Sequence, residues 1–434
     1  MLDTADTAPT AGRAPEGWSI RLVVVCLAAL SVSLPIAWIS LTKSLLFIFG
    51  LGYLLADLWM GRGEPALKRL WTTHIVLLTL VLFAFSLWWT QADMTDALSS
   101  YVKHAKLLGI LLLVSLIRTR REARLGLLFY AGGQFFLLLS SWMIFAGIPL
   151  PWVAEHTTQN VVFSTYLDQS IMLAATAAVF WHLRQDGLWP KWLGLTAAML
   201  ALANALLLLE GRTGYLIALS SLSLGLMWAM PSRYRLATMV VTPLVVLLTL
   251  SLVSTQIHER ITKIVSESVN YSQSQQVGAG DSSGWRLNAW RRSLQAMATK
   301  PLYGYGVGAW TPAVKQFEDS KVATQLYGEG NHSNPHQEYL LWGVELGIGG
   351  LLLLLALMIA VARDALRFPT NIQRATLSVL AAMAIASLFN STLYDDWIGD
   401  FFCISLGLLL AMGSRSATST ETKTQRNHRN KAVT

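Results

Sequence analysis

Cysteine and charged residues are both scarce in this sequence. Cys26 and Cys403 are the only cysteines among 434 residues, and each lies in a long apolar run. Two thiols in such positions cannot form a disulfide framework or the thiolate cluster of a metal site. Only 13% of the residues are charged, against about a quarter in a soluble globular protein. The composition therefore predicts a protein that is solvated mainly by lipid.

Apolar runs recur along the chain at the length needed to cross a bilayer. A helix needs about 20 apolar residues to span a hydrocarbon core that is about 30 Å thick. We therefore expect an all-α integral membrane protein with about twelve transmembrane helices. The expected spans cover residues 20–38, 41–60, 72–90, 105–117, 126–145, 166–183, 191–210, 214–230, 236–255, 339–362, 375–392 and 397–412.

The distribution of lysine and arginine predicts the orientation of these spans. With the N-terminus in the cytoplasm, most of the 33 Lys and Arg residues fall on the inner side and most of the 25 carboxylates on the outer side. The first 19 residues show no cleavable signal pattern, so we expect an uncleaved anchor. Both termini are then cytoplasmic, and the net charge of +8 reflects topology, with no need of a nucleic-acid partner.

This topology divides the chain into five parts. They are an N-terminal tail (1–19), spans one to nine (20–255), a large outer loop (256–338), spans ten to twelve (339–412) and a C-terminal tail (413–434). A loop of that length is usually functional or disordered. We expect a helical continuation of the ninth span through Ile257, Ile261 and Ile264, and then a polar tether.

A second helix is expected near the middle of the loop, from an N-cap at Ser282 or Ser283 to Pro301. Its apolar stripe contains Trp290 and, on the same face, Arg286. A buried arginine is costly unless it is paired or meets an anion, although a snorkelling side chain is the alternative.

The short outer turn "EGRTG" contains another arginine, Arg212. We expect Thr213 to cap the following span, which leaves Arg212 beside the positive end of a helix. Backbone N–H groups and a guanidinium at such an end can bind a phosphate. The alternative is an ion pair between Arg212 and Glu210.

Two histidines, His332 and His336, precede the tenth span. Their spacing in "HSNPH" resembles that of a helical zinc motif, but Pro335 disfavours the continuous helix that such a site requires. We expect Pro335 to start the span and His336 to lie in its first turn, where the positive helix end lowers the pKa of an imidazole. A neutral imidazole there can act as a general base, or it can simply hydrogen-bond to its neighbours.

Three glycines, Gly304, Gly306 and Gly308, follow the loop helix in "LYGYGVGAW". They do not stand between a strand and a helix, so we interpret them as a tight turn and not as a nucleotide site. Glu345 is expected inside the tenth span, on the face opposite His336, as a packing group.

Taken together, these motifs resemble the O-antigen ligase and polymerase superfamily. The shared signature is an arginine with a tryptophan four residues later, "PLxGxGxG", and "H-[NQ]-x-x-L" leading to "E-x-G-x-x-G". This chain supplies Arg286, Trp290, Pro301, Leu302, Gly304, Gly306, Gly308, His336, Gln337, Leu340, Glu345, Gly347 and Gly350. The turn that contains Arg212 is also similar to that of the family, whereas Gln337 replaces the more common asparagine.

The resemblance implies a GT-C-like glycosyltransferase that works at the periplasmic face of the bacterial inner membrane. The implied donor is a glycan on undecaprenyl diphosphate, and the implied acceptor of a ligase is a sugar of lipid A-core. Arg212 and Arg286 would stabilise the departing diphosphate, and His336 would be the base. Arg291, Arg292 and His332 are further candidates for contacts with the substrate.

We expect this chemistry to need no metal or other cofactor. Metal-dependent multi-span glycosyltransferases tend to have a carboxylate in the first outer loop, which is "SLTKS" here. Asp395, Asp396 and Asp400 lie in a later outer segment.

Other functions of the same superfamily remain open. A polymerase or a protein O-oligosaccharyltransferase shares these motifs, although the former tends to have two large outer loops and the latter an added soluble region. A transporter of lipid-linked glycans is the non-enzyme alternative, and it would not need the outer arginines or the histidine.

Overall fold

The computed structural model describes residues 19–61, 64–153, 160–253, 262, 266–267, 269, 282–318 and 334–433. Within these residues all regular secondary structure is helical. The helices are α1 (Ile20–Ser31), α2 (Ile36–Trp59), α3 (Pro65–Arg69), α4 (Trp71–Ser86), α5 (Met94–Ala105), α6 (Leu108–Leu116), α7 (Arg120–Phe145), α8 (Tyr166–Leu183), α9 (Lys191–Ala203), the π-helical turn η1 (Asn204–Leu208), α10 (Arg212–Ala229), the 3-10 turn η2 (Ser232–Tyr234), α11 (Arg235–Val253), α13 (Ser282–Thr299), α14 (Trp310–Lys315), α16 (Glu338–Leu346), α17 (Ile348–Ala365), α18 (Thr370–Phe389) and α19 (Asp396–Val433).

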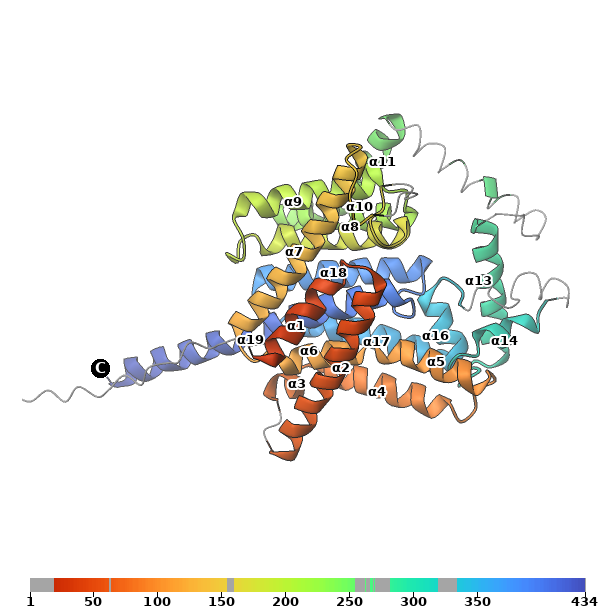
Figure 1. Cartoon of the computed structure of the whole chain (residues 1–434), viewed down its shortest axis with the longest axis horizontal. Helices are drawn as coiled ribbons and strands as arrows, with labels where there is room; N and C mark the ends of the chain where they lie inside the picture. The colour runs from red at the N-terminus through yellow and green to blue at the C-terminus, as the bar shows by residue number, and fades with distance from the viewer. Residues whose placement is uncertain are drawn as a thin grey trace, which may run out of the picture.

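Many of the long helices cross the molecule in roughly the same direction, which is horizontal in Figure 1. The helices α13, α14 and α16 lie at one end, and the C-terminal part of α19 extends from the other. The first part of α19 is the central helix, because 89% of the residues in its apolar stretch are buried inside the protein. It packs against α6, α7 and α18.

Local sequence explains where several of these helices begin. Thr119 and Glu122 form a capping box at the start of α7, and Thr165 and Asp168 form another at the start of α8. In each box the two side chains satisfy backbone N–H groups that the first turn of a helix leaves unpaired. Proline precedes α2, α9 and α18, where its missing N–H costs nothing.

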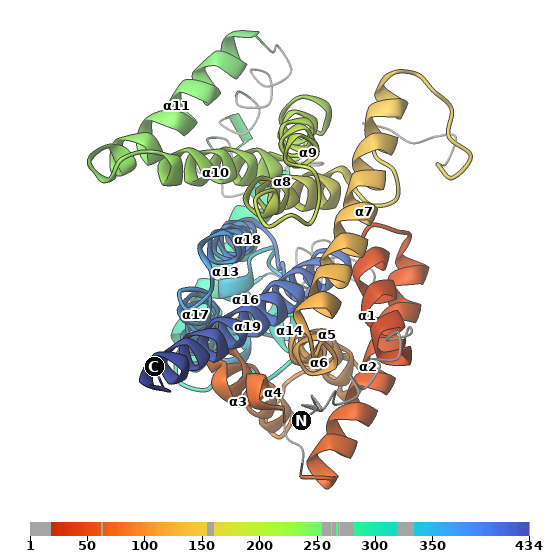
Figure 2. The same cartoon turned by 90° about the vertical axis from the view of Figure 1, so that its left-hand side faces the viewer.

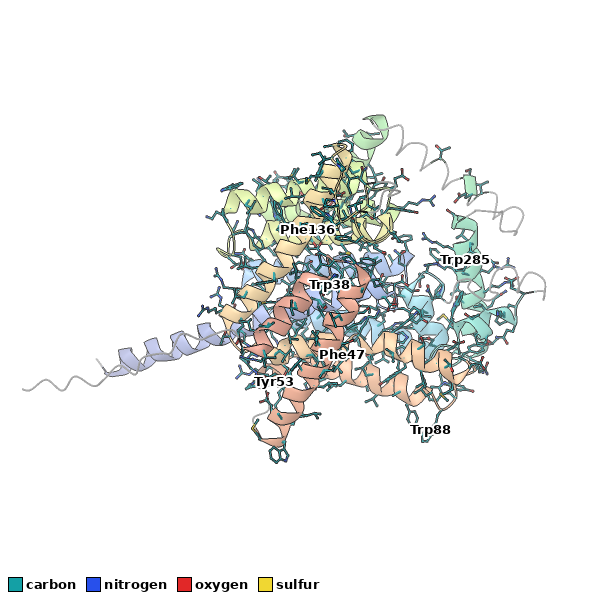
Figure 3. All side chains as sticks on the ribbon, viewed as in Figure 1. Trp38, Phe47, Tyr53, Trp88, Phe136 and Trp285 are labelled. Carbon is teal, nitrogen blue, oxygen red and sulfur yellow. The ribbon has the colours of Figure 1, made fainter. Side chains whose placement is uncertain are left out.

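Seven helices of the described part of the chain are long and apolar enough to cross a membrane, and two shorter apolar helices, α1 and α4, accompany them. Large apolar side chains lie on the outside of the bundle, among them the 83% exposed Trp88 (Figure 3). Such exposure is unfavourable in water and suits contact with lipid. The chain is therefore an all-α multi-pass membrane protein. Every expected span coincides with a helix, while their number, twelve, stays a prediction.

The structure corrects the boundaries of five expected spans. The first turn is formed by residues 32–35, so "SLTKS" (40–44) lies within α2 and is not a loop. The fourth span begins well before 105, because α5 and α6 together form one crossing, Met94–Leu116. The expected tenth span is two helices, α16 and α17, and α19 continues through most of the segment expected to be a polar tail.

Helix α11 stands apart from the rest of the bundle (Figure 2). Its main contacts within the described residues are with α10 and η2. Large side chains on several of its faces are exposed, including Leu236 at 77% and Leu244 at 62%. Only an apolar solvent can cover such a helix at low cost, so α11 is held chiefly by α10 and lipid.

Candidate functional site

Helix α13 forms the framework of the site. It is described from Ser282 onward, so both expected N-cap candidates, Ser282 and Ser283, lie within its first turn. Ser283 lies in the first turn, where its backbone N–H donates to Glu267 at 3.3 Å and its hydroxyl accepts from Arg212 at 2.9 Å. The helix ends at Thr299, just before Pro301, as expected. The first turn of α13 is thereby joined to the start of α10.

Arg286 lies one turn further along α13, and it has no hydrogen bond or ion pair with any residue that the structure describes. Burial lowers the pKa of this guanidinium, and the neighbouring charge of Arg212 lowers it further, while Tyr166 and Asp395 act in the opposite direction. A partly buried cation beside a second cation is unfavourable unless an anion joins them. The arrangement is therefore suited to bind a negatively charged group.

Arg212 is the first residue of α10, whose N-cap is Gly211. The expectation that Thr213 caps this helix is wrong, because Thr213 lies inside the first turn and its hydroxyl accepts from Asn390 at 3.2 Å. The expected position of Arg212 at a helix N-terminus is confirmed. Besides Ser283, its guanidinium approaches Glu267 at 4.0 Å.

The two glycines that flank Arg212 and Thr213 allow α10 to approach α8 closely. A Cβ atom on Gly211 or Gly214 would lie 2.0 Å or 2.3 Å from the hydroxyl oxygen of Ser170 on α8. Any larger residue would push the start of α10, and Arg212 with it, away from α8.

His336 lies in a turn that α13 holds in place. Its backbone is in the left-handed region (φ 48°), and its N–H donates to the side chain of Asn334 at 2.9 Å. The imidazole packs edge-on against Trp285, with ring centroids 5.4 Å apart. The indole N–H of Trp290 donates to the carbonyl of Pro335 at 3.0 Å. Trp285 and Trp290 therefore fix the turn on the same helix that carries Arg286, at the end of the bundle seen in Figure 3.

The expectation that Pro335 starts a helix with His336 in its first turn is wrong. Helix α16 begins at Glu338, and Gln337 is its N-cap, with a side chain that accepts from the N–H of Leu340 at 2.6 Å. A residue with positive φ cannot continue a right-handed helix, so the turn separates His336 from α16. His336 is adjacent to the helix end but is not part of it.

The further candidates are arranged differently. Arg292 is held by both oxygens of Glu318, at 2.6 Å and 2.9 Å, and Asn288 donates to the same carboxylate at 2.9 Å. Its charge is thus used within the loop. Arg291 is on the exposed side of α13. His332 and the three isoleucines of the expected helical continuation lie outside the described residues, as does most of the expected tether.

Asp395 is a site residue that sequence reasoning considered only as a metal ligand. Burial raises the pKa of its carboxyl to about 7, and the charge of Asp168 raises it as well, against the opposing effects of Lys106 and Lys103. The same carboxyl acts on Arg286. The ammonium of Lys106 donates to the backbone carbonyl of Asp395 at 2.8 Å and so holds this turn in place. We refer to Arg212, Arg286, His336 and Asp395 as the α13 site.

Glu338 connects the two turns of this site. One of its oxygens accepts from the backbone N–H groups of Leu393 at 2.9 Å and Tyr394 at 3.3 Å, and the other accepts from the indole of Trp342 at 2.6 Å. Burial raises the pKa of Glu338 to about 7. Through these bonds the start of α16, just after His336, is tied to the turn that ends in Asp395.

The three glycines after α13 pack against the break between α16 and α17. The N–H of Gly306 donates to the carbonyl of Glu345 at 2.8 Å, and the N–H of Gly308 donates to its carboxylate at 2.7 Å. All three glycines and Gly347 have positive φ. A Cβ atom on Gly304 would lie 2.5 Å from the carbonyl oxygen of Glu345. We call Gly304, Gly306, Gly308, Glu345 and Gly347 the glycine lock.

Glu345 is the centre of this lock and is fully buried. Its carboxylate also accepts from the hydroxyl of Ser100 at 3.2 Å and lies 2.9 Å from the ring of His104. These contacts agree with the expectation of a packing group, although Glu345 belongs to α16 and not to a continuous tenth span.

Metal binding would need several ligands close together. In the part of the chain that the structure describes, no group of three or more His, Cys, Asp or Glu side chains is arranged to hold a metal ion.

Comparison with known proteins gives one result. Residues 197–355 match the model of a family described as O-antigen ligase. The matched segment contains Arg212, Arg286, His336 and the glycine lock. No curated protein matches the chain. The match shows that this segment is similar to the O-antigen ligase family, in agreement with the motifs in the sequence.

Proposed function

We propose that this protein is an O-antigen ligase. It transfers a glycan from undecaprenyl diphosphate to a sugar hydroxyl of lipid A-core, at the periplasmic face of the inner membrane and with both termini in the cytoplasm. The observation that carries the proposal is the position of Arg286, a partly buried guanidinium beside Arg212 with no ion pair among the described residues. A diphosphate is an anion of the size and charge that would satisfy both arginines.

The leaving group determines what the site must supply. The acceptor hydroxyl attacks the anomeric carbon, the bond from that carbon to the diphosphate oxygen breaks, and undecaprenyl diphosphate departs. Negative charge grows on that oxygen in the transition state, so fixed guanidinium groups lower the barrier. Because a diphosphate leaves as a stable anion, no general acid and no metal is required in this scheme.

The proton of the acceptor hydroxyl needs a base, and His336 is our candidate. Its turn is fixed by Trp285 and Trp290, so the ring is held beside α13 without being part of a helix. A base that is positioned in this way can contribute about 10²–10⁴-fold to the rate. Attack from the face opposite the diphosphate inverts the configuration of the anomeric carbon.

The remaining candidates have supporting roles in this proposal. The charge of Asp395 acts on Arg286 without a direct ion pair, so the guanidinium stays available for the diphosphate. The charge of Arg292 is already used by Glu318, which leaves Arg291 and His332 as the further basic contacts for the bulky substrates.

A transfer assay distinguishes this function from its alternatives. Purified protein is incubated with undecaprenyl-diphosphate glycan, lipid A-core and excess chelator, and wild type is compared with His336→Ala and Arg286→Ala. We expect glycan on lipid A-core despite the chelator, and loss of transfer in both variants.

Each other outcome points to a different function. Extension of the donor on itself would identify a polymerase, and transfer to a protein acceptor alone would identify a protein O-oligosaccharyltransferase. Movement of the lipid-linked glycan across vesicle membranes without any transfer would identify a transporter and overturn the site assignment.

A further inference from the structure

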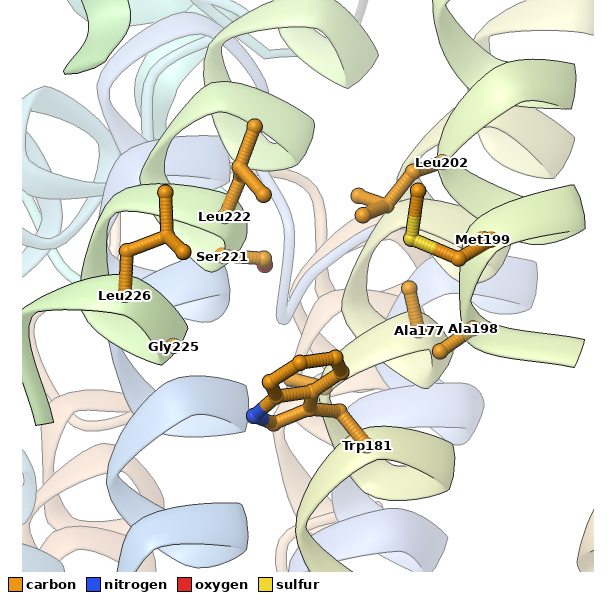
Figure 4. A pocket seen from close by; sticks show the side chains of 10 residues that line it. Ala177, Trp181, Ala198, Met199, Leu202, Ser221, Leu222, Gly225 and Leu226 are labelled. Carbon is orange, nitrogen blue, oxygen red and sulfur yellow. The ribbon is translucent and has the colours of Figure 1, made fainter. Parts of the chain in front are cut away.

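An apolar pocket lies between α8, α9 and α10, far from the α13 site (Figure 4). The space in it that a water-sized molecule can occupy is only about 30 Å³, and it opens to the surroundings of the bundle, so it is a shallow apolar groove between the three helices. Apolar side chains such as Met199, Leu202 and Leu222 line it, and Trp181 forms its floor in Figure 4. In a helix bundle that is surrounded by lipid, such a pocket accommodates hydrocarbon better than water.

The catalytic candidates lie near the start of α8, whereas the pocket lies nearer to its end. Tyr166, whose charge acts on Arg286, is the first residue of α8, and the helix has 18 residues. At a rise of 1.5 Å per residue it is about 27 Å long, so Trp181 and Arg184 lie close to the far end. By the distribution of lysine and arginine this end is predicted to face the cytoplasm.

One guanidinium covers the floor of the pocket, and a second acts on the histidine next to that floor in the sequence. Arg184 covers the ring of Trp181 at 3.8 Å, and its charge and that of Arg374 both act on His182. Arg374 lies 5.7 Å from the ring of Trp228 and has no hydrogen bond or ion pair in the described part of the chain. The guanidinium of Arg184 donates to the backbone carbonyl of Trp181, which leaves most of its five N–H groups for another partner.

A buried imidazole adds a further polar group without a partner. His182 is 5% exposed, packs edge-on against Trp228, and its Nε2 atom has no hydrogen-bond partner among the described residues. The nearby carboxyl of Asp186 interacts instead with Asn371, Arg120 and Arg124. The charges of Arg184 and Arg374 are therefore not neutralised by that carboxylate.

We propose that this end of the bundle binds an anionic phospholipid, with its phosphate on Arg184 and Arg374 and part of one acyl chain along the groove between α8, α9 and α10. Each part of the lipid has a counterpart in the site. Arginines and tryptophans at a membrane interface contact lipid headgroups, and the apolar pocket contacts an acyl chain. The lipid would hold α10 against α8 and α9 and so support the helix that carries Arg212. This inference does not depend on the proposed transfer reaction.

Native mass spectrometry of the delipidated full-length protein tests the proposal without any activity assay. Phosphatidylglycerol and phosphatidylcholine are titrated against wild type, the double variant Arg184→Gln/Arg374→Gln, and Leu222→Trp, which fills the pocket. Arg121→Gln is the control for the loss of a guanidinium elsewhere, because it removes one positive charge from the exposed side of α7.

We expect tighter binding of phosphatidylglycerol than of phosphatidylcholine by wild type. The double variant should weaken phosphatidylglycerol by about tenfold or more and leave phosphatidylcholine nearly unchanged. Leu222→Trp should weaken both lipids, and Arg121→Gln should weaken neither by more than about twofold.

Three results would overturn the proposal. The first is equal binding of phosphatidylglycerol by wild type and the double variant, and the second is an equal loss in Arg121→Gln, which would show only a general attraction to positive charge. The third comes from a competition experiment. If undecaprenyl diphosphate displaces phosphatidylglycerol from wild type but not from Leu222→Trp, the pocket binds the isoprenoid chain.

Discussion

Glu345 and Arg286 are both charged side chains in the segment that matches the family model, and their surroundings differ. Glu345 is fully buried, and its carboxylate meets Gly308, Ser100 and His104. Arg286 is partly buried beside another cation and has no hydrogen bond or ion pair among the described residues. Breaking up a buried charge and its partners is strongly destabilising, whereas a buried charge without partners costs stability and is a candidate place for a ligand. The glycine lock and the α13 site thus divide the motif into a structural part and a candidate functional part.

The largest effect that separates the two parts is expected from Gly306→Ala. Residue 306 has φ +88°, and a Cβ atom there would lie 2.3 Å from the Cα atom of Thr90. Since backbone cannot move aside easily, we expect a loss of roughly 3–5 kcal/mol of stability. The measurement is the yield and thermal stability of purified protein in detergent.

Gly349→Ala is the control for this substitution. A Cβ atom on Gly349 would meet no atom within 4 Å, so alanine there should leave the melting temperature unchanged or raise it slightly. Equal stability of the two variants would mean that the glycine lock is not a structural element.

The second effect is on the reaction and not on the fold. Arg286→Ala should lower the transfer rate by about 10²–10³-fold, the usual cost of removing one fixed donor to a developing anion. Its melting temperature should stay the same or rise, because the substitution removes a charge without an ion pair. Lys315→Ala, an exposed residue on α14 that loses the same charge, should change neither quantity. A marked fall in stability for Arg286→Ala would place this residue with Glu345 on the structural side.

The third effect, of Glu345→Gln, is the reverse of that of Arg286→Ala: it should lower stability more than the transfer rate. An amide can replace only some of the contacts that the carboxylate makes with Gly308, Ser100 and His104. We expect a loss of about 1–3 kcal/mol of stability. The transfer rate per folded molecule should change far less than in Arg286→Ala, as measured on monodisperse fractions. A loss of rate as large as that of Arg286→Ala, with stability kept, would give Glu345 a direct role in the reaction.

The sequence predicts the helices well and their interruptions poorly. Long apolar runs are sufficient to locate helices within a few residues, because lipid requires them. The break at Gly347 was not expected, since its φ of +64° is imposed by contact with Pro301 on a distant segment. The start of α5 at Met94 was missed because its first turns are polar. The glycine lock, a segment distant in sequence, covers these turns, and hydropathy does not reveal such a contact.

The site was only partly accessible to sequence reasoning. Arg212 and Arg286 could be located because arginines on a burying helix face or at a helix N-terminus stand out in a single sequence. The pairing of Arg292 with Glu318 and the burial of Asp395 depend on packing between separate segments. Such contacts leave no local pattern, and the turn of His336 depends in the same way on Trp285 and Trp290.

The smallest expected effect is on the pH dependence of stability and comes from Asp395. This residue belongs to the α13 site, and burial disfavours its ionised form. Its pKa is about 7 in the folded protein, against 3.8 for an ordinary aspartate. Between about pH 4 and pH 7 the folded state therefore holds more protons than the unfolded state, and stability falls as the pH rises through this window. Asp395→Asn should abolish this contribution and be more stable than wild type at pH 8, by roughly 1 kcal/mol after solvent screening.

The measurement for Asp395 is the melting temperature in detergent from pH 4 to pH 8, compared between wild type, Asp395→Asn and Asp396→Asn. Glu338 has a raised pKa too, so wild type alone would not identify the responsible group, whereas the difference between wild type and Asp395→Asn does. Asp396→Asn is the comparison because its side chain is 52% exposed and its charge is the smallest of the effects on the pKa of Asp395, so it should change the pH dependence far less. If Asp395→Asn is instead less stable than wild type at pH 8, the ionised carboxylate is a favourable partner of Arg286 and Lys106. Arg286 would then be neutralised within the protein, and a diphosphate would have to displace Asp395 to bind.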